Sequence, residues 1–281
     1  MIIVGVDGSV PSRAAVEWAA DDALRMREPL RVVHAVDRSW YQVGKFPIED
    51  MPDTLLRNGR QVLRDAREVA HDRQPGVEVT TLDVEGVPAV VLEDQAKDAT
   101  EVVVGSRGLG GFAGTLLGSV STHVAGHVHC PVVVVRGERR PAPYGEIVVG
   151  VDDSPECEPA LAYAFEQAKL RGARLRVVHG WQLPVHAYVP GVTYDLDEIR
   201  AARRQVVRDR VAIFAQDYPQ VTVVEDAPQA HPVQALTEAS ERADLVVVGS
   251  HGRGTLGSAL LGSVSRGTLH HAACPVAVVR A

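Results

Sequence analysis

Short runs of apolar, mostly β-branched residues alternate along this chain with longer segments in which apolar residues recur every three or four positions. The short runs predict strands and the longer segments predict amphipathic helices, because the two spacings match the two backbone geometries. The four valines at 132–135 form a run with no polar residue. Such strands are typical of parallel sheets that are covered by helices on both faces.

The pattern predicts five strands and four helices in each half of the chain. The strands lie near residues 1–6, 30–36, 77–83, 101–105 and 131–135, and near 146–151, 174–180, 220–225, 244–248 and 275–279. The helices lie near residues 11–27, 54–72, 87–98 and 119–129, and near 155–171, 194–217, 231–242 and 264–272. Strands that alternate with helices imply right-handed crossovers, so we expect an α/β fold with a doubly wound, open parallel sheet in each half.

The two halves repeat one another almost from end to end, at an offset of 144 or 145 residues. The repeated segments are VGVDGS at 4–9 and VGVDDS at 149–154, RVVH at 31–34 and 176–179, VVVGS at 102–106 and 246–250, LLGSVS at 116–121 and 260–265, and CPV at 130–132 and 274–276. A duplication of this length predicts two tandem domains. We place them at 1–137 and 146–281, joined by a charged, Pro- and Gly-containing linker at 138–145.

Composition narrows the classes of function. With 281 residues, 46% of them apolar, each half can bury a core of its own. The net charge of −7 and the 5% aromatic content do not fit a nucleic-acid-binding surface. Three widely spaced cysteines do not form a disulfide framework or a zinc knuckle. No signal-like segment or long apolar run is present, so we expect a cytoplasmic protein that does not enter a membrane.

Candidate chemistry lies in the turns after the first and fourth strands of each half. In doubly wound sheets, ligands bind beyond the carboxyl ends of the strands where the winding reverses. After each fourth strand the chain has the pattern G-x2-G-x9-G-[ST], at 105–119 and again at 249–263. Glycines let a backbone approach a ligand closely, and a free helix N-terminus attracts an anion. The pattern therefore predicts a phosphate site, in which Ser119 and Ser121 can donate hydroxyl hydrogen bonds.

A purely structural explanation stays open for single residues. Any one of these glycines could serve only as a turn or helix cap. Asp7 could cap the first helix together with Ser9. His34 and His179 could be partly buried residues with satisfied hydrogen bonds.

The glycine pattern resembles the ATP-binding signature of the universal stress proteins, and the resemblance covers nearly all of both halves. It implies the fold of the adenine nucleotide alpha hydrolase-like (HUP) class, a strand order of 3-2-1-4-5, and pairing of the two domains through their last strands. It also implies that Asp7 and Asp152 contact the nucleoside and that the backbone of Ala35 and Gly180 borders the adenine. Minor differences between the halves are Arg107 opposite His251, and Gly8 opposite Asp153, which adds negative charge.

The resemblance implies a full set of cofactor-binding residues for ATP, with or without Mg²⁺. In the first half they are Gly5, Val6, Asp7, Ala35, Gly105, Ser106, Arg107, Gly108, Gly118, Ser119, Val120 and Ser121. In the second half they are Gly150, Val151, Asp152, Gly180, Gly249, Ser250, His251, Gly252, Gly262, Ser263, Val264 and Ser265. We expect no catalytic residue, no metal held by protein side chains alone, and a homodimer in addition to the intramolecular domain pair.

Two other motifs are disfavoured by their context. The segments 108–113 and 252–257 fit the dinucleotide pattern G-x-G-x-x-[GA], but they follow the fourth strand rather than the first. A cluster of His123, His127, His129 and Cys130 could ligate a metal, yet only two of its four members recur in the second half. The aromatic residues in the connections after the second strands are interpreted as a flap over the ligand; they are Trp40, Tyr41, Phe46, Tyr188 and Tyr194.

Three functions remain open on the sequence. No Walker A motif, nucleophile elbow or loop lysine is present, which favours a nucleotide-dependent regulator or sensor over an enzyme. The resemblance implies that this regulator acts in a stress or dormancy response. A slow ATPase or a phosphotransferase that modifies Ser119 or Ser263 is the second possibility. A dimerisation scaffold with a vestigial pocket is the third.

Overall fold

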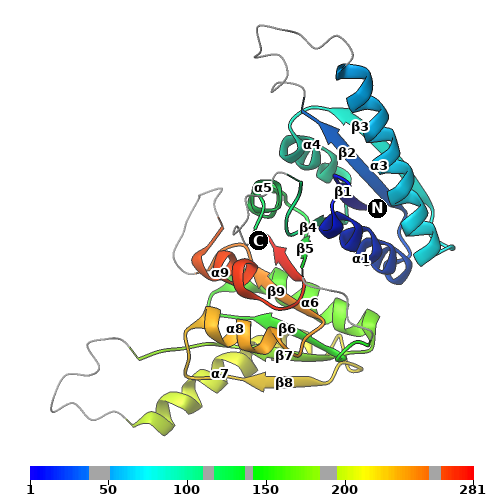
Figure 1. Cartoon of the computed structure of the whole chain (residues 1–281). Coiled ribbons are helices and arrows are strands. Elements are labelled where there is room, and N and C mark those ends of the chain that lie inside the picture. The colour runs from blue at the N-terminus through cyan, green and yellow to red at the C-terminus, as the bar shows by residue number, and fades with distance from the viewer. Residues whose placement is uncertain (38–50, 110–116, 137–141, 184–194, 253–260) are drawn as a thin grey trace, which may run out of the picture. The chain divides into compact units, whose positions relative to one another are not determined.

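The computed structural model describes residues 1–37, 51–109, 117–136, 142–183, 195–252 and 261–281. The chain forms two compact units, Met1–Arg139 and Arg140–Ala281, which we call the first and second unit (Figure 1). The predicted linker at 138–145 spans their boundary, and its residues 138–141 lie outside the described part. The proposed flap aromatics Trp40, Tyr41, Phe46, Tyr188 and Tyr194 lie outside it as well.

The first unit alternates strands and helices as the sequence predicts. Its elements are β1 (Ile2–Val6), α1 (Val10–Met26), β2 (Leu30–Val36), α3 (Met51–Arg73), β3 (Val79–Glu85), α4 (Pro88–Gln95), the 3₁₀ helix η1 (Ala96–Asp98), β4 (Glu101–Gly105), α5 (Ser119–His127) and β5 (Val132–Val135). The strands pair in parallel in the order β3-β2-β1-β4-β5, which confirms the predicted order 3-2-1-4-5.

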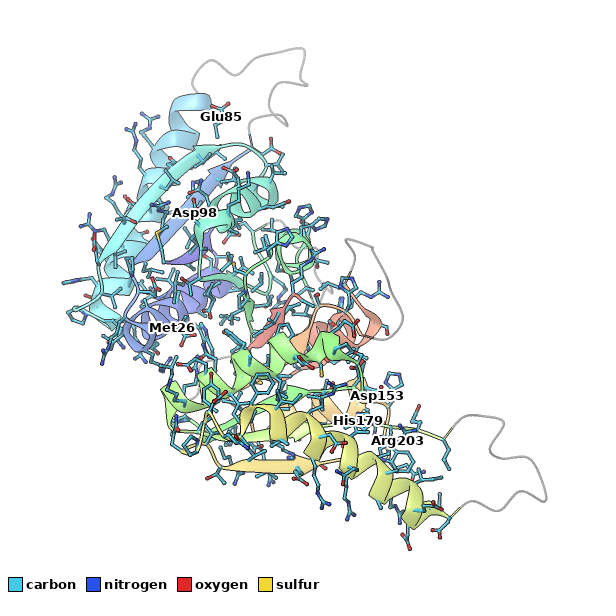
Figure 2. The ribbon with its side chains drawn as sticks, turned by 180° about the vertical axis from the view of Figure 1, so that it is seen from behind. Met26, Glu85, Asp98, Asp153, His179 and Arg203 are labelled. Carbon is cyan, nitrogen blue, oxygen red and sulfur yellow. The ribbon has the colours of Figure 1, made fainter. Side chains whose placement is uncertain are left out.

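Helices cover both faces of this sheet. α1 packs against β1, β4 and α3, whereas α4 and α5 pack against one another (Figure 1). Double coverage explains why β1 and β5 have almost no exposed side-chain surface. Glu85 at the end of β3 marks the carboxyl edge of the sheet, and Met26 at the end of α1 lies at the opposite edge (Figure 2).

The second unit repeats this architecture. Its elements are β6 (Glu146–Gly150), η2 (Pro155–Cys157), α6 (Glu158–Arg171), β7 (Arg174–Val178), α7 (Leu196–Phe214), β8 (Val223–Asp226), α8 (Pro232–Ser240), β9 (Leu245–Gly249), α9 (Ser263–His271) and β10 (Val276–Val279). Its parallel order is β8-β7-β6-β9-β10, so β6 lies between β7 and β9 as β1 lies between β2 and β4.

Several element boundaries differ from the predictions. β3 and β8 begin two or three residues later than predicted, because the amides of Val77 and Val221 close turns onto the carbonyls of Gln74 and Tyr218. The helix predicted over 155–171 starts as the 3₁₀ helix η2 before α6. Prolines at N-terminal positions of both helices lack the amide that a continuous α-helix would use there.

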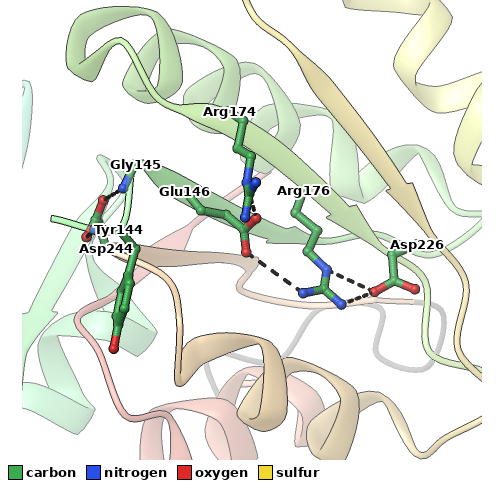
Figure 3. A network of polar contacts seen from close by, with 7 residues as sticks. All are labelled: Tyr144, Gly145, Glu146, Arg174, Arg176, Asp226 and Asp244. Atoms are coloured by element: carbon green, nitrogen blue, oxygen red, sulfur yellow. Dashed lines mark hydrogen bonds and ion pairs between the residues drawn. The ribbon is translucent and has the colours of Figure 1, made fainter.

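A polar network ties together the strands of the second unit (Figure 3). Glu146 is 97% buried at the start of β6, and its Oε2 accepts a hydrogen bond from Arg174 Nε at 2.5 Å. Arg176 bridges Glu146, at 3.8 Å, and Asp226, to which its Nε donates at 2.9 Å. Burying a carboxylate is costly unless it is paired, so these arginines account for Glu146 at the edge of the core.

The described end of the predicted linker belongs to the same region of the second unit. The amides of Tyr144 and Gly145 each donate to the carboxylate of Asp244 at 2.8 Å (Figure 3). Gly145 has φ of +70°, which a side chain would disfavour. Asp244 therefore holds the backbone of Tyr144 and Gly145 against the second unit, just before β6 begins.

Candidate functional site

A single carboxylate joins the two turns at the mouth of the first sheet. β1 and β4 are neighbours, so the turns that follow them meet at the carboxyl edge. Asp7 Oδ1 accepts from the Ser9 amide at 3.0 Å, and its Oδ2 accepts from the Leu109 amide at 2.8 Å. Asp7 therefore fixes both the start of α1 and the loop after β4.

The turn after β4 lies against this carboxylate. We call residues 105–108 and 249–252 the glycine turns. A Cβ on Gly108 would lie 2.4 Å from Asp7 Oδ2, and a Cβ on Gly252 would lie 2.7 Å from Asp152 Oδ2. A side chain at either position would force the carboxylate to shift, so glycine lets the turn approach the acid as closely as it does.

Serine hydroxyls connect each glycine turn to the helix that follows. Ser121 on α5 is buried, and its hydroxyl donates to the carbonyls of Ser106 and Gly118 at 3.2 and 3.0 Å. The Gly118 amide donates to the Ser106 carbonyl at 2.8 Å. Ser121 therefore serves to hold the turn and the helix together, which leaves Ser119 as the exposed hydroxyl at the helix start.

The N-terminus of α5 has no side-chain cap in the described part of the chain. Gly118 is the N-cap residue, with φ of −82° and ψ of 159°, and no side chain among the described residues caps the helix there. A Cβ at Gly118 would meet its nearest neighbours at 3.5 Å, which is ordinary contact. The first amides of a helix lack intrahelical acceptors, so this end carries donors and a positive dipole suited to an anion.

The second unit builds the same arrangement. Asp152 Oδ1 accepts from the amide and the hydroxyl of Ser154 at 3.0 and 2.5 Å. The Gly262 amide donates to the Ser250 carbonyl at 2.8 Å, and Gly262 starts α9 without a capping side chain among the described residues. Ser265 donates to the Gly249 and Ser250 carbonyls at 2.5 and 3.3 Å. The contact with Ser250 is the equivalent of the contact between Ser121 and Ser106 in the first unit.

Three of the predicted glycines serve packing within the fold. A Cβ on Gly5 or Gly150 would meet a leucine of α4 or α8 at 2.8 or 2.9 Å, since Leu92 and Leu236 lie over them. A Cβ on Gly105 would meet the Pro11 backbone at 2.7 Å. These glycines let helices approach the sheet, whatever they contribute to a ligand.

The other predicted residues form three pairs, each with one member in either unit. Val6 and Val151 are buried, so their contribution to a ligand could come only from the backbone. Ala35 is half-buried within β2, near its end. Gly180 lies close to the start of α8, because a Cβ on it would be 2.7 Å from Pro232 Cα. Val120 and Val264 lie half-buried in the first turns of α5 and α9.

Charged residues near the two sites differ. Arg107 is exposed in the first unit, whereas His251 lies within 3.1 Å of the Ser250 hydroxyl in the second. Arg210 of α7 donates to the Asp153 carbonyl at 2.6 Å and pairs with Glu158 at 3.1 Å. Sequence analysis did not identify Arg210. The repeat contained a signal for it, since the motif RQV[LV]RD at 60–65 and 204–209 aligns Arg210 with an alanine.

Cysteines and histidines are further reactive groups in the described part of the chain. Burial raises the pKa of the Cys130 thiol to about 11 and also raises the pKa of Cys157. Thiols with such pKa values stay protonated near neutral pH and are poor nucleophiles. His123 contacts Glu93 at 3.1 Å and stacks on His127, but no group of three side chains in the described part is arranged to hold a metal ion.

Comparison with known proteins places this geometry in a family. The model of the universal stress protein family matches residues 1–136 and again residues 143–280. Universal stress protein Rv2623 of Mycobacterium tuberculosis is 37% identical over 99% of this chain and 96% of its own length. A universal stress protein of Mycolicibacterium smegmatis is 36% identical, again over 99% and 96%.

Solved structures agree on the fold. A universal stress protein of Archaeoglobus fulgidus superposes with a TM-score of 0.73 at 21% identity, over 99% of this chain and 95% of that one. No helix in the described ranges has the length and apolar character needed to cross a bilayer. Both halves match one family model, and the relatives align along nearly their whole length, so this chain belongs to the universal stress protein family.

Proposed function

We propose that each unit binds ATP or a closely related adenine nucleotide at the carboxyl edge of its sheet, and that occupancy regulates the protein in a stress or dormancy response. The observation that carries this proposal is the uncapped N-terminus of α5 beside a glycine turn, repeated at α9. Helix N-termini of this kind are suited to phosphates.

The phosphates would lie against the helix start. The amides at Ser119 and Ser263 and their exposed hydroxyls supply donors without a Cβ at the preceding glycine to keep the ligand away. The dipole adds about 0.3–2 kcal/mol for a negative group at this position. Where Mg²⁺ accompanies the nucleotide, the phosphates would supply much of its oxygen coordination, because Mg²⁺ prefers substrate phosphates and water to a cage of protein ligands.

The nucleoside would lie on the side of the acid. Asp7 and Asp152 stand at the centre of each sheet mouth with their oxygens directed at the surrounding turn amides. The backbones at Ala35 and Gly180 follow the neighbouring strand and would border the base.

A binding role fits these groups better than catalysis. Phosphoryl transfer needs a positioned base and cationic groups around the phosphate. The cysteines with raised pKa values are protonated, and Arg107 is the cation that directly follows a glycine-turn serine in the first unit. A nucleotide that binds one conformation better than another would shift the population between them, which is sufficient for regulation.

Calorimetry of the purified full chain tests the proposal. We expect ATP to bind, and the double variant Gly118→Val, Gly262→Val to lose binding, because the valine side chains would obstruct the phosphate approach. Gly76→Val is the matched control, since a Cβ at Gly76 has no neighbour within 4 Å and lies away from both sites. Retained micromolar binding by the double variant would overturn the phosphate assignment, and single-turnover assays with Mg²⁺ would reveal any hydrolysis.

A further inference from the structure

The two units differ in the charged residues around one pair of equivalent histidines, His34 in the first unit and His179 in the second. The shared motif at 60–65 and 204–209 aligns Gly59 of α3 with Arg203 of α7. Val33 and Val178 are equivalent in the repeat, and they pair with Leu82 and Asp226 on the neighbouring strands. The residues after these partners are therefore equivalent too, so Asp83 of the first unit corresponds to Ala227 of the second. The second unit has therefore lost a carboxylate and gained a guanidinium.

In the first unit the histidine has a carboxylate partner. His34 at the end of β2 lies with its Nδ1 2.9 Å from Asp83 Oδ1. A Cβ on Gly59 would lie 2.9 Å from His34 Cε1 and Nδ1, so α3 packs directly on the imidazole ring. The carboxylate therefore pairs with Nδ1 of the ring, and α3 packs against the same ring.

In the second unit the equivalent imidazole lacks a partner on one side. His179 is 94% buried, and its Nδ1 lies 3.0 Å from the Val151 carbonyl. A carbonyl only accepts, so Nδ1 carries the proton and Nε2 presents a lone pair. That Nε2 is buried and has no hydrogen-bond partner among the described residues. Buried acceptors of this kind are uncommon and call for an explanation.

Arg203 lies close enough for its charge to act on this ring. Burial first, and then Arg203, lowers the pKa of His179, while Asp152 acts in the opposite direction. The neutral form with its free lone pair is thereby favoured. Arg203 is half-buried and forms no hydrogen bond or ion pair within the described part of the chain, and Figure 2 labels it with His179 and Asp153. The long side chain has no carboxylate to hold it in place, so it can move aside for a ligand.

We propose that His179 and Arg203 recognise a sugar hydroxyl of the nucleotide bound in the second unit, an inference that rests on the proposed function. A hydroxyl satisfies both groups at once: its hydrogen is donated to His179 Nε2 and its oxygen accepts from the Arg203 guanidinium. An amino group could satisfy only the imidazole, and a phosphate oxygen only the guanidinium. The contact of His179 with the Val151 carbonyl places the ring beside Asp152 at the proposed nucleoside position.

The test uses the full chain with the first site blocked by Gly118→Val. Calorimetry compares ATP with 2′-deoxy-ATP and 3′-deoxy-ATP. We expect one of the two analogues to bind about tenfold more weakly or worse, because removal of the hydroxyl leaves the buried polar groups unpaired. Arg203→Gly, which restores the residue of the first unit, reduces this discrimination, and His179→Phe abolishes it. His179→Gln, which keeps a donor and an acceptor, retains part of it.

The outcomes separate this inference from the proposed function. Loss of ATP binding in the second unit would overturn both. ATP binding with equal affinity for the deoxy analogues, or a discrimination unchanged by Arg203→Gly, would overturn the hydroxyl assignment alone and leave a buried water as the partner of His179. With the second site blocked by Gly262→Val instead, Arg203→Gly should leave the first site's preferences unchanged. Arg203 is partly exposed, so this variant tests the proposal even if His179→Phe does not fold.

Discussion

At the scale of single residues, one carboxylate organises each site. Asp7 accepts two backbone amides that lie 100 residues apart in sequence, from Ser9 and from Leu109. The sequence could suggest the first contact, because an acid two residues before a helix start often forms such a turn. It could not show the second, which depends on the pairing of β1 with β4.

The variant Asp7→Ala should therefore affect both binding and stability. Two amides lose a charged acceptor, so we expect the free energy of unfolding to fall by about 1–3 kcal/mol. Affinity for ATP and for adenosine should fall alike, by about tenfold, which corresponds to ~1.4 kcal/mol. Denaturation and calorimetry on the same preparation measure the two effects. Asp7→Asn keeps one acceptor oxygen and should lie between the alanine variant and the parent; a loss confined to ATP would instead assign Asp7 to the phosphates or the metal.

His179 makes the stability of the second unit depend on pH. Its folded-state pKa is lowered from 6.5, first by burial. The unfolded chain therefore takes up the proton more readily, and the stabilising contribution of neutral His179 is complete above about pH 6.5 and is lost as the pH falls through the folded-state pKa. The slope for one proton is at most about 1.4 kcal/mol per pH unit.

Urea denaturation between pH 7.5 and 5 checks this expectation. His179→Gln cannot be protonated in this range, so its stability should fall less steeply with decreasing pH than that of the parent protein. His34→Gln serves as the comparison, because Asp83 pairs with that imidazole in the first unit. Parallel pH profiles for the parent and His179→Gln would contradict the assignment of His179 as a buried neutral group.

At the scale of elements, the glycines of one motif have different structural roles, because a different part of the chain packs against each of them. Gly105 admits Pro11 of α1, Gly108 admits the Asp7 carboxylate, and Gly118 has ordinary space around it. The motif spacing was enough to locate the turn and the start of α5. The separate reasons for each glycine could not be predicted, because they depend on which distant element packs against it.

This difference predicts losses of stability of unequal size from the same substitution. Gly105→Ala should lower the free energy of unfolding by about 2–3 kcal/mol, since the new Cβ would lie 2.7 Å from the Pro11 backbone. Gly118→Ala should cost about 1 kcal/mol or less, the price of a poorer N-cap, because its Cβ meets neighbours only at 3.5 Å. Thermal and urea denaturation of the two variants compare them directly. Equal losses would show that the space around Gly118 is not as the structure has it.

Element types were predictable because apolar runs and helical periods record burial on both faces of a parallel sheet. The strand order was predicted from the resemblance to the universal stress proteins and not from these patterns. The first and last residues of the elements were harder to predict than their types. β3 and β8 start late because Val77 and Val221 form turn hydrogen bonds. The sequence could not show this, because valine has a high strand propensity whether it lies in the strand or just before it. The 3₁₀ start before α6 depends on how Pro155 and its neighbours meet the turn after β6, which periodicity does not record.

At the scale of the whole molecule, the repeated fold has two candidate sites that are alike in backbone and different in charge. The helix starts, glycine turns and bridging serines repeat, as the internal repeat predicts. Arg107, Arg203 and Arg210 have no arginine at the equivalent position of the other unit, where His251, Gly59 and Ala66 stand in their places. The backbone similarity predicts two sites, and the charge differences predict that they are not equivalent.

The stoichiometry of nucleotide binding tests this expectation for the full chain. Neither α5 nor α9 has a side-chain cap at its start within the described ranges. We therefore expect two ATP molecules per chain in the parent protein, one in Gly118→Val, one in Gly262→Val and none in the double variant. The two single variants should differ in affinity and in its salt dependence, because exposed Arg107 near the first site is screened by salt more than half-buried Arg203 near the second. Calorimetry at low and high salt measures both quantities. The parent chain could instead bind one ATP, which one single variant abolishes and the other leaves unaffected. That result would mean that one of the two units has kept the backbone of the site but does not bind the nucleotide.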